Sequence, residues 1–317
     1  MTPVSLIRCP DYEAVHVGDA LDRAFTYIGG LSSYVRSGDR VLVKPNLLQG
    51  LPPETATTTH PAVLDALLSR LIDLGARPQI GDAPAWGLWR QVVERCGVAE
   101  VAHRYGVPLA EFDQPVPVPS VRPEVLPQFM VDRAVRDADA VINVPKLKSH
   151  RQLGFTAGVK NLYGCMPGKR KAYYHMARGN RDSDFASLVA AFAYTVAPAL
   201  TLVDGVVAME REGPSRGDPR TVGALIASAD PAAADAVVAE VIRAPVADRL
   251  LLDACRRLRL GSPEMDTIDV RGETVAAMAV PDFRHPLLIG VRFSPGRLAR
   301  SVWRNFLMTR LGYEAAR

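Results

Sequence analysis

Three consecutive segments decide the fold of this chain: DRVLVKPN (39–46), HPAVLDALLSRLIDLG (60–75) and RPQIGDAP (77–84). The first and the third are short runs with apolar centres, which is typical of buried strands. The middle segment repeats apolar residues at helical spacing, with Pro61 in its first turn and Gly75 at its end. A strand, a helix and a second strand in this order predict a parallel βαβ unit.

The same alternation continues along the chain. Further strands are predicted within residues 137–146 (DADAVINVPK), 198–205 (PALTLVDG) and 223–230 (GALIASAD). After the last of them, Asp230 and Pro231 are the expected cap and first residue of another helix. We therefore expect an α/β fold in which a mostly parallel sheet is flanked by helices, in two lobes with a cleft between them.

Three regions are expected. Residues 1–127 form an N-terminal α/β lobe that ends in a proline-rich connection, residues 128–270 form a second α/β lobe, and residues 271–317 form a C-terminal extension. The prolines of residues 114–127 exclude a helix interior and a central strand, which leaves a connection between lobes or an edge structure. The amphipathic basic pattern of residues 295–317 predicts a helix that packs or forms a homo-oligomer, with contact to a membrane surface as the minor alternative.

Composition indicates an ordinary globular protein, because 48% of the residues are hydrophobic and 23% are charged. A net charge of +4 and a pI near 8.9 suit anionic ligands, but they fall short of the basicity of a dedicated nucleic-acid binder. No signal peptide and no apolar run of ~20 residues is found, so we expect a cytoplasmic protein without a membrane span. The cysteines are scattered without a C-x-x-C pair, which argues against a zinc site or a cysteine-ligated iron–sulfur cluster: Cys9, Cys96, Cys165 and Cys255.

Four predicted strands are each followed by polar residues. These strands end near Val43, Ile80, Val144 and Val203. Ligands of open α/β sheets bind outside the carboxyl ends of the strands. If these strands are neighbours, the polar residues gather along one edge of the sheet. They are Lys44 and Asn46, Gly81 and Asp82, then Lys146, Lys148 and His150, and finally Asp204 and Gly205.

The stretch NVPKLKSHRQLGFTAGVKNLYGCMPGKRK (143–171) is the richest in lysine. Lys146, Lys148 and His150 alternate, so an extended backbone points all three to the same side. Glycines then let the chain turn or approach a ligand before the next polar pair, Lys160 and Asn161. Clustered lysines cost electrostatic energy unless carboxylates or a bound phosphate or carboxylate compensates them, and such crowding lowers a lysine's pKa and makes it usable as a base. The alternative is a solvated loop.

Two further segments carry candidate residues. In TTTHP (57–61), the hydroxyls of Thr58 and Thr59 and the free amides of a helix start suit an anion, and His60 can transfer a proton. Simple N-capping by Thr59 is an equal alternative. In KAYYHMARGN (171–180), His175 is either catalytic or part of a lid, and Arg178 is a candidate for substrate binding.

The acidic residues allow a metal hypothesis. Asp82, Asp204 and Glu210 are candidates for Mg²⁺, although salt bridges to the lysines are the favoured role for these carboxylates. Binding of Mg²⁺ is therefore the minor hypothesis for these residues.

Seven segments, taken in order, resemble the family called domain of unknown function 362. They are VLVKPNLL, TTTHPAVLDAL, IGDAP, VINVPKLKSH, GVKNLYGCMPG, VDGVVAMEREGPSRG and ASADPAAADAV, within residues 40–242. The resemblance implies a shared α/β fold, and the family has no general activity assigned to it. Many relatives carry a ferredoxin-like cysteine module, which implies redox work, but this chain has none. A more distant, fold-level similarity to the lactate racemase class implies histidines and a lysine at a cleft between lobes, without its nickel cofactor.

Our leading hypothesis from the sequence is an enzyme that acts on a small anionic metabolite by acid–base chemistry, such as an isomerisation, cyclisation or elimination, in a biosynthetic pathway. Lysines 146, 148 and 160 anchor the anion, and His150, or else His60 or His175, moves the proton. One alternative is a redox scaffold that binds flavin or works with an iron–sulfur partner. The other is nucleic-acid binding, with Phe155, Tyr163, Tyr173 and Tyr174 stacking on bases.

Overall fold

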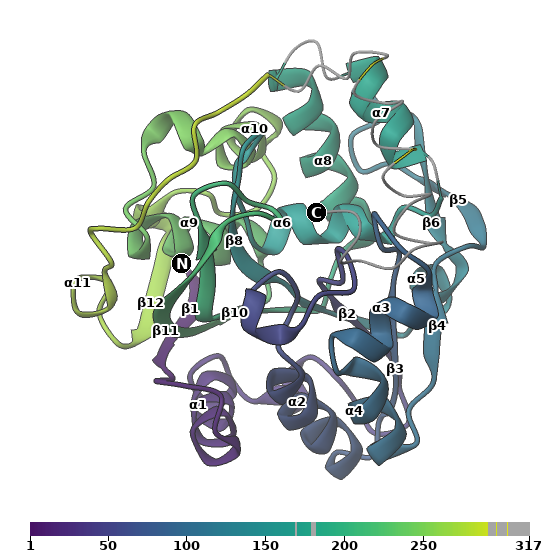
Figure 1. Ribbon diagram of the computed structural model, residues 1–317, viewed down its shortest axis with the longest axis vertical. Helices are drawn as coiled ribbons and strands as arrows, with labels where there is room; N and C mark the ends of the chain where they lie inside the picture. The colour runs from purple at the N-terminus through teal and green to yellow at the C-terminus, as the bar shows by residue number, and fades with distance from the viewer. Residues whose placement is uncertain (169, 179–181, 291–295, 297–302, 304–317) are drawn as a thin grey trace.

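The computed structural model describes residues 1–168, 170–178, 182–290, 296 and 303 (Figure 1). The predicted βαβ unit is present as β2 (Arg40–Pro45), α2 (Pro61–Asp73) and β3 (Arg77–Asp82). β2 and β3 pair in parallel. Proline stands at the first position of α2, and the apolar stripe of this helix is buried, so local pattern and tertiary packing agree here.

The main sheet has the strand order β12-β1-β11-β10-β7-β2-β3-β4. The strands not yet introduced are β12 (Ile268–Gly272), β1 (Thr2–Arg8), β11 (Asp218–Ser228), β10 (Leu200–Glu210), β7 (Ala140–Val144) and β4 (Leu109–Glu111). The run from β10 to β4 is parallel throughout, whereas β11 is antiparallel to both of its neighbours. After Pro145 the chain continues as β8 (Lys146–His150), which pairs with β10 and with β9 (Gly154–Thr156). The expected mostly parallel sheet is confirmed.

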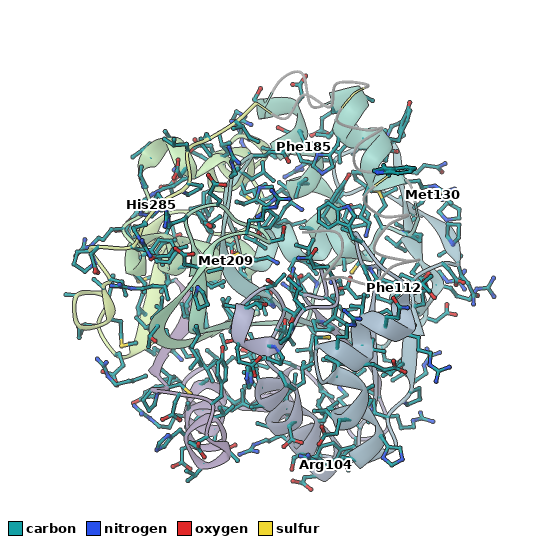
Figure 2. The ribbon with its side chains drawn as sticks, in the orientation of Figure 1. Arg104, Phe112, Met130, Phe185, Met209 and His285 are labelled. Carbon is teal, nitrogen blue, oxygen red and sulfur yellow. The ribbon has the colours of Figure 1, made fainter. Side chains whose placement is uncertain are left out.

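Helices cover both faces of this sheet, as Figure 1 shows. One face carries α2 with α1 (Ala14–Tyr27), α3 (Trp89–Arg95) and α4 (Val98–Tyr105). The other carries α6 (Gly158–Leu162), α8 (Asp182–Val196), α9 (Pro231–Val241) and α10 (Leu250–Leu258). The remaining helices are α5 (Arg133–Asp137), α7 (Arg170–Arg178) and α11 (Val275–Met278). Each face therefore has its own hydrophobic core. Figure 2 adds the side chains to the ribbon in the same orientation.

The connections leave β2 and β7 in opposite directions. From β2 the chain crosses through α2 to β3, and from β7 it crosses through α6 and α8, on the other face, to β10. β2 and β7 are themselves neighbours. The topological switch point of the sheet therefore lies between them, and the crevice outside their carboxyl ends is where α/β sheets bind ligands.

Two predicted strand limits are wrong. β10 runs past Val203 to Glu210, and β11 begins at Asp218 rather than Gly223. The additional residues pair with one another in a long antiparallel hairpin, from Val207 opposite Thr221 onwards. Asp204 and Gly205 therefore lie inside a strand, since this pairing extends β10 where the local pattern alone indicated a loop.

The proline-rich segment is an edge structure, one of the two alternatives. β5 (Pro115–Pro119) pairs with β6 (Gln128–Asp132) in a separate two-stranded antiparallel sheet. Proline occupies every second position of β5, which leaves the alternate valines to donate hydrogen bonds.

The fold does not test three of the predictions from the sequence. The division at residues 127 and 270 and the two-lobed arrangement stay predictions, and the helix expected in residues 295–317 lies outside the described residues. No helix in the described part of the chain is both long enough and apolar enough to cross a bilayer.

Candidate active site

Five lysines, which we call the lysine cluster, gather at the switch point: Lys44, Lys146, Lys148, Lys160 and Lys171. Lys44 is the residue before the end of β2, Lys146 is the first residue of β8, and Lys148 lies in the middle of β8. Lys160 lies on α6 and Lys171 on α7. The prediction that the strands at this edge are neighbours is confirmed, because β10, β7, β2 and β3 are consecutive in the sheet.

Lys44 and Asp82 form a buried ion pair at the ends of β2 and β3, with 2.9 Å between Nζ and Oδ1. The same carboxylate accepts hydrogen bonds from the backbone N–H groups of Leu47 and Ala83. Gly164 packs directly on the pair: a Cβ there would lie 2.7 Å from the Lys44 nitrogen. Asp82 is therefore fully engaged in holding Lys44 and the loop after β2.

Lys146 and Asp204 form a second buried pair, at 3.0 Å. Tyr12 completes it, because its hydroxyl accepts a hydrogen bond from Lys146 (2.5 Å) and donates one to Asp204 (2.8 Å). Burial lowers the pKa of Lys146, against the attraction of Asp204. The Tyr12 ring stacks on the His60 ring, with centroids 3.5 Å apart, and the backbone N–H of His60 donates to Asp204.

Lys148 has no carboxylate partner among the described residues. Its Nζ donates to Asn46 Oδ1 and to the carbonyl of Thr57, both at 2.7 Å. Asn46 in turn donates to Asn161, and Asn161 donates to Asn143 on β7. This chain of amides fixes the position of Lys148. Burial, and then repulsion from Lys160, holds the pKa of Lys148 well below its ordinary value.

Lys160 is half-buried, and its amine lies over the ring of Tyr163, with 5.0 Å between Nζ and the ring centroid. Within the described residues it has neither a hydrogen bond nor a carboxylate partner. Burial, with repulsion from Lys171 and Lys44, lowers the pKa of Lys160 to about 7. This amine is therefore present in both protonation states near neutral pH.

His150, at the end of β8, is buried and neutral. Burial, followed by Lys160, His175 and Lys148, holds its pKa well below the ordinary value. Its Nδ1 accepts a hydrogen bond from the N–H of Gln152 at 3.2 Å. The proton of the neutral ring is therefore on Nε2, where it can be donated.

His175, on α7, packs against Tyr163 and against Phe185, which Figure 2 labels. Burial, with Lys160 and Lys171 nearby, lowers the pKa of His175 to about 3. Lys171, on the same helix, donates to the carbonyl of Ala83 after β3 at 2.6 Å, and burial lowers its pKa to about 8. α7 therefore lies against the cluster.

The alternative in which Thr59 caps α2 is wrong. His60 is the cap, because its Nδ1 accepts from the N–H of Ala62. The Thr59 hydroxyl instead donates to Val144 and accepts from the N–H of Asn46, which ties the ends of β7 and β2 together. Thr58 is completely buried, and its hydroxyl has no hydrogen-bond partner in the described structure. Burial lowers the pKa of His60 to about 4.

Two candidate residues have partners elsewhere. Arg178 donates to the carbonyl of Val125, and Glu210 binds the Arg284 guanidinium. No group of three or more histidine, cysteine, aspartate or glutamate side chains that could hold a metal occurs in the described part of the chain. The four cysteines are free and buried. Phe155 and Tyr163, expected to stack on bases, are buried in the cores instead.

Sequence reasoning missed three residues of this region: Tyr12, Asn143 and Asp235, whose carboxylate accepts from the N–H groups of Gly158 and Val159. It included Lys171 in the lysine-rich stretch but gave it no role at the site. One signal could have singled it out. Only six of the 38 lysines and arginines of the chain are lysines, and five of the six form the lysine cluster, while Lys169 lies outside the described residues.

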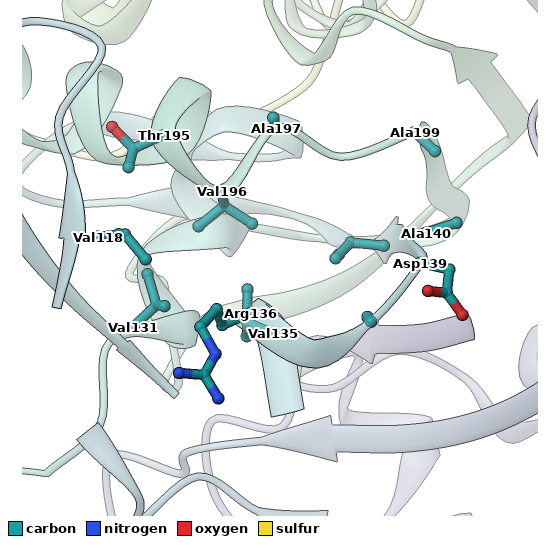
Figure 3. A pocket seen from close by; sticks show the side chains of 12 residues that line it. Val118, Val131, Val135, Arg136, Asp139, Ala140, Thr195, Val196, Ala197 and Ala199 are labelled. Carbon is teal, nitrogen blue, oxygen red and sulfur yellow. The ribbon is translucent and has the colours of Figure 1, made fainter. Parts of the chain in front are cut away.

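A separate cavity of about 300 Å³ lies at the other end of β7 (Figure 3). Most of the residues that line it are valines and alanines, and Arg136 and Asp139 are among its polar residues. These two side chains are held in ion pairs with Asp137 and Arg40. Because Ala140 begins β7 and the lysine cluster lies beyond its far end, this cavity is not part of the candidate site.

A family model described as "Domain of unknown function (DUF362)" matches residues 41–240. The chain belongs to this family. The matched region begins in β2 and ends in α9, and so contains the whole lysine cluster together with Asp82, Asp204 and Asp235. The family resemblance seen in the sequence is confirmed.

This DUF362 protein is 36% identical over 304 residues to a thylakoid-associated protein of Synechocystis sp., which covers 96% of this chain and 94% of that protein. Among solved structures, the lactate racemase apoprotein from Thermoanaerobacterium thermosaccharolyticum matches with a TM-score of 0.45 and 11% identity. That match covers 73% of this chain and 55% of the racemase, about half of its length. It transfers no reaction to the DUF362 protein.

Proposed function

We propose that this DUF362 protein is an enzyme that binds a small anionic metabolite at the switch point between β2 and β7 and moves a proton on it. Isomerisations, cyclisations and eliminations are reactions of this kind, in which a base removes a proton and donors stabilise the negative charge that develops. In this proposal Lys160 is the base, His150 donates a hydrogen bond from Nε2, and Lys148 binds the anion.

The observation that carries the proposal is the half-buried, unpaired amine of Lys160. Lys44 and Lys146 are neutralised by Asp82 and Asp204, whereas no described carboxylate neutralises Lys160. An amine with a pKa of about 7 is largely neutral at slightly alkaline pH and is matched to proton transfer. A cation held among other cations costs free energy in the unliganded protein, and a bound anion removes this cost.

The choice of lysine supports a chemical role. Arginine supplies the great majority of the positive charges of the chain and makes its exposed ion pairs, such as Arg40–Asp139 and Arg104–Asp65. A guanidinium holds an anion at least as well as an ammonium, but it does not lose its proton in a protein. Lysine at this site therefore fits a group that has to become neutral.

The experiment is hydrogen exchange with substrate candidates. The purified protein is incubated in D₂O with a panel of small carboxylates and phosphorylated metabolites, and proton NMR follows the loss of each C–H signal. We expect exchange on at least one anion, at a rate that rises with pH through about 7 as Lys160 loses its proton.

Two variants of Lys160 distinguish its role as a base from the effect of its positive charge. Lys160→Arg keeps the cation but cannot lose a proton, and Lys160→Met removes the amine. We expect both to lower the exchange rate by roughly 10²–10⁴-fold, while Arg104→Met, which breaks a surface pair on α4, leaves it unchanged. Wild-type exchange in Lys160→Arg would overturn the role of Lys160, and no exchange and no binding of any anion would overturn the proposal as a whole.

A further inference from the structure

Two buried threonine hydroxyls beside Lys148 lack partners. Thr156 is 2% exposed and Thr58 is 0% exposed, and neither Oγ1 has a hydrogen-bond partner in the described part of the molecule. A buried hydroxyl without a partner costs about 1–3 kcal/mol, and native proteins contain few such groups. Two of them near one lysine therefore call for an explanation.

Both threonines are placed next to Lys148 by the backbone. Thr156 is directly opposite Lys148 in the antiparallel β8–β9 pair, so the two side chains lie on the same face of the sheet. Thr58 follows Thr57, whose carbonyl accepts a hydrogen bond from the Lys148 amine at 2.7 Å. The neighbouring Thr59 provides a contrast, because its hydroxyl makes two hydrogen bonds to the protein.

In its protonated form, Lys148 can donate one more hydrogen bond. Two of its three N–H donors are taken by Asn46 and by the Thr57 carbonyl, and both of these acceptors are neutral. One ammonium N–H of Lys148, the hydroxyl of Thr156 across the strand pair and the hydroxyl of Thr58 next to Thr57 therefore have no acceptor in the described structure. A carboxylate has two oxygen acceptors that suit such a set.

The helix starts near the site argue for a carboxylate rather than a phosphate. Phosphate groups are commonly bound by free backbone N–H groups at a helix N-terminus. At α2, the N–H of His60 donates to Asp204, Pro61 has none, and the N–H of Ala62 donates to His60. At α6, both first N–H groups donate to Asp235. The protein's own side chains therefore occupy the amides that a phosphate would use.

We propose that Lys148, Thr58 and Thr156 form a subsite for the carboxylate group of the substrate. This inference rests on the proposed function, to which it adds the chemical class of the anion. Lys160 and His150, which interact electrostatically with Lys148, then face the part of the substrate next to that carboxylate.

The test compares anions and matched threonine variants. Binding of acetate, malonate and benzoate, and of inorganic phosphate and pyrophosphate, is measured by calorimetry and by thermal shift at constant ionic strength. Thr156→Val and Thr58→Val remove one hydroxyl each and keep the shape, and Thr156→Ser keeps the hydroxyl. Thr195→Val is the control, because that hydroxyl donates to Ala191, accepts from the N–H of Val121 and lies in the wall of the separate cavity.

We expect a carboxylate to bind more tightly than phosphate, and each valine variant of the subsite to lose about tenfold in carboxylate affinity. Thr156→Ser and Thr195→Val should bind as the wild type does. The melting temperature of the unliganded Thr156→Val and Thr58→Val proteins should not fall, because no protein hydrogen bond is removed.

Three results would overturn the subsite, and they are distinguishable. Tighter binding of phosphate than of every carboxylate, lost in Lys148→Met, would leave the proposed function standing and remove the carboxylate assignment. Carboxylate binding that is unchanged in both valine variants would remove the two threonines. If no anion binds to the wild type, and Lys148→Met gives the same calorimetric and thermal-shift results as the wild type, both the proposed function and the subsite are contradicted.

Discussion

At the scale of single residues, partners separate the lysines of the cluster into two kinds. Lys44 and Lys146 each have a buried carboxylate at about 3 Å. These two lysines therefore hold segments of the fold together in addition to placing positive charge at the site. Lys160 has none among the described residues, and its pKa is lowered to about 7 by burial and by other lysines. Groups arranged in this way are characteristic of functional sites, where charge is kept at the expense of stability.

This difference predicts opposite effects of the same substitution. We expect Lys160→Met to raise the free energy of unfolding at pH 7, because a destabilised cation is replaced by an apolar side chain of similar length. Lys146→Met should lower it by about 3–5 kcal/mol, because Asp204 is left buried without its cation. Urea denaturation at pH 7 measures both, and a loss of stability in Lys160→Met would contradict the assignment.

The pH dependence of Lys160 has a definite sign. Its pKa is about 7 in the folded protein and 10.5 ordinarily, so between these values the unfolded chain binds more protons than the native state. The stability of the wild type relative to Lys160→Met therefore rises as pH increases from about 7 to 10.5. Denaturation curves at several pH values within this range show it directly.

At the scale of elements, α6 depends on a single carboxylate. α6 has five residues, which is too short to be stable by itself. Asp235, on α9, accepts from the N–H groups of Gly158 and Val159 at 2.5 and 3.1 Å. Because α6 carries Lys160 and Asn161, this cap holds both the proposed base and the amide chain that positions Lys148.

We expect Asp235→Asn to destabilise the protein by about 1–3 kcal/mol, because an amide accepts from one N–H and leaves the other without a partner. Burial raises the pKa of Asp235 from 3.8 to about 7, so between these values the native state binds a proton that the unfolded chain does not. The wild type therefore loses stability relative to the variant as pH rises from about 4 to 7. A stability difference that is constant over this range would contradict the account.

At the scale of the whole molecule, the site joins segments that are far apart in the chain. Tyr12, between β1 and α1, reaches Asp204 on β10 and Lys146 on β8, and its hydroxyl also accepts from the N–H of Val207. The N-terminal segment is thereby connected to the long hairpin in the middle of the sheet.

Tyr12→Phe tests this connection. We expect a loss of about 1–3 kcal/mol, because removal of the hydroxyl takes a partner from Lys146 and from Asp204 inside the protein. Tyr34→Phe is a matched control, since it removes one local bond to the carbonyl of Ile28 and should cost less. Equal effects of the two substitutions in urea denaturation would show that Tyr12 contributes only an ordinary hydrogen bond.

The sequence by itself determined the βαβ unit, the limits of α2 and the polar residues after the parallel strands. These features depend on local causes: the spacing of apolar residues, a proline in the first turn and the direction of each strand. The lengths of β10 and β11 could not be predicted from the sequence, because the end of β10 and the start of β11 are extended only by pairing with each other.

Tertiary structure alone decided the chemistry open to each lysine. Lys44 and Lys146 meet carboxylates that are 38 and 58 positions away, and Lys160 meets other lysines instead. The sequence contains the same side chain in all three places. Burial and the neighbours that the fold brings together set the pKa of each amine, because the cost of a charge depends on the solvent and the charges around it.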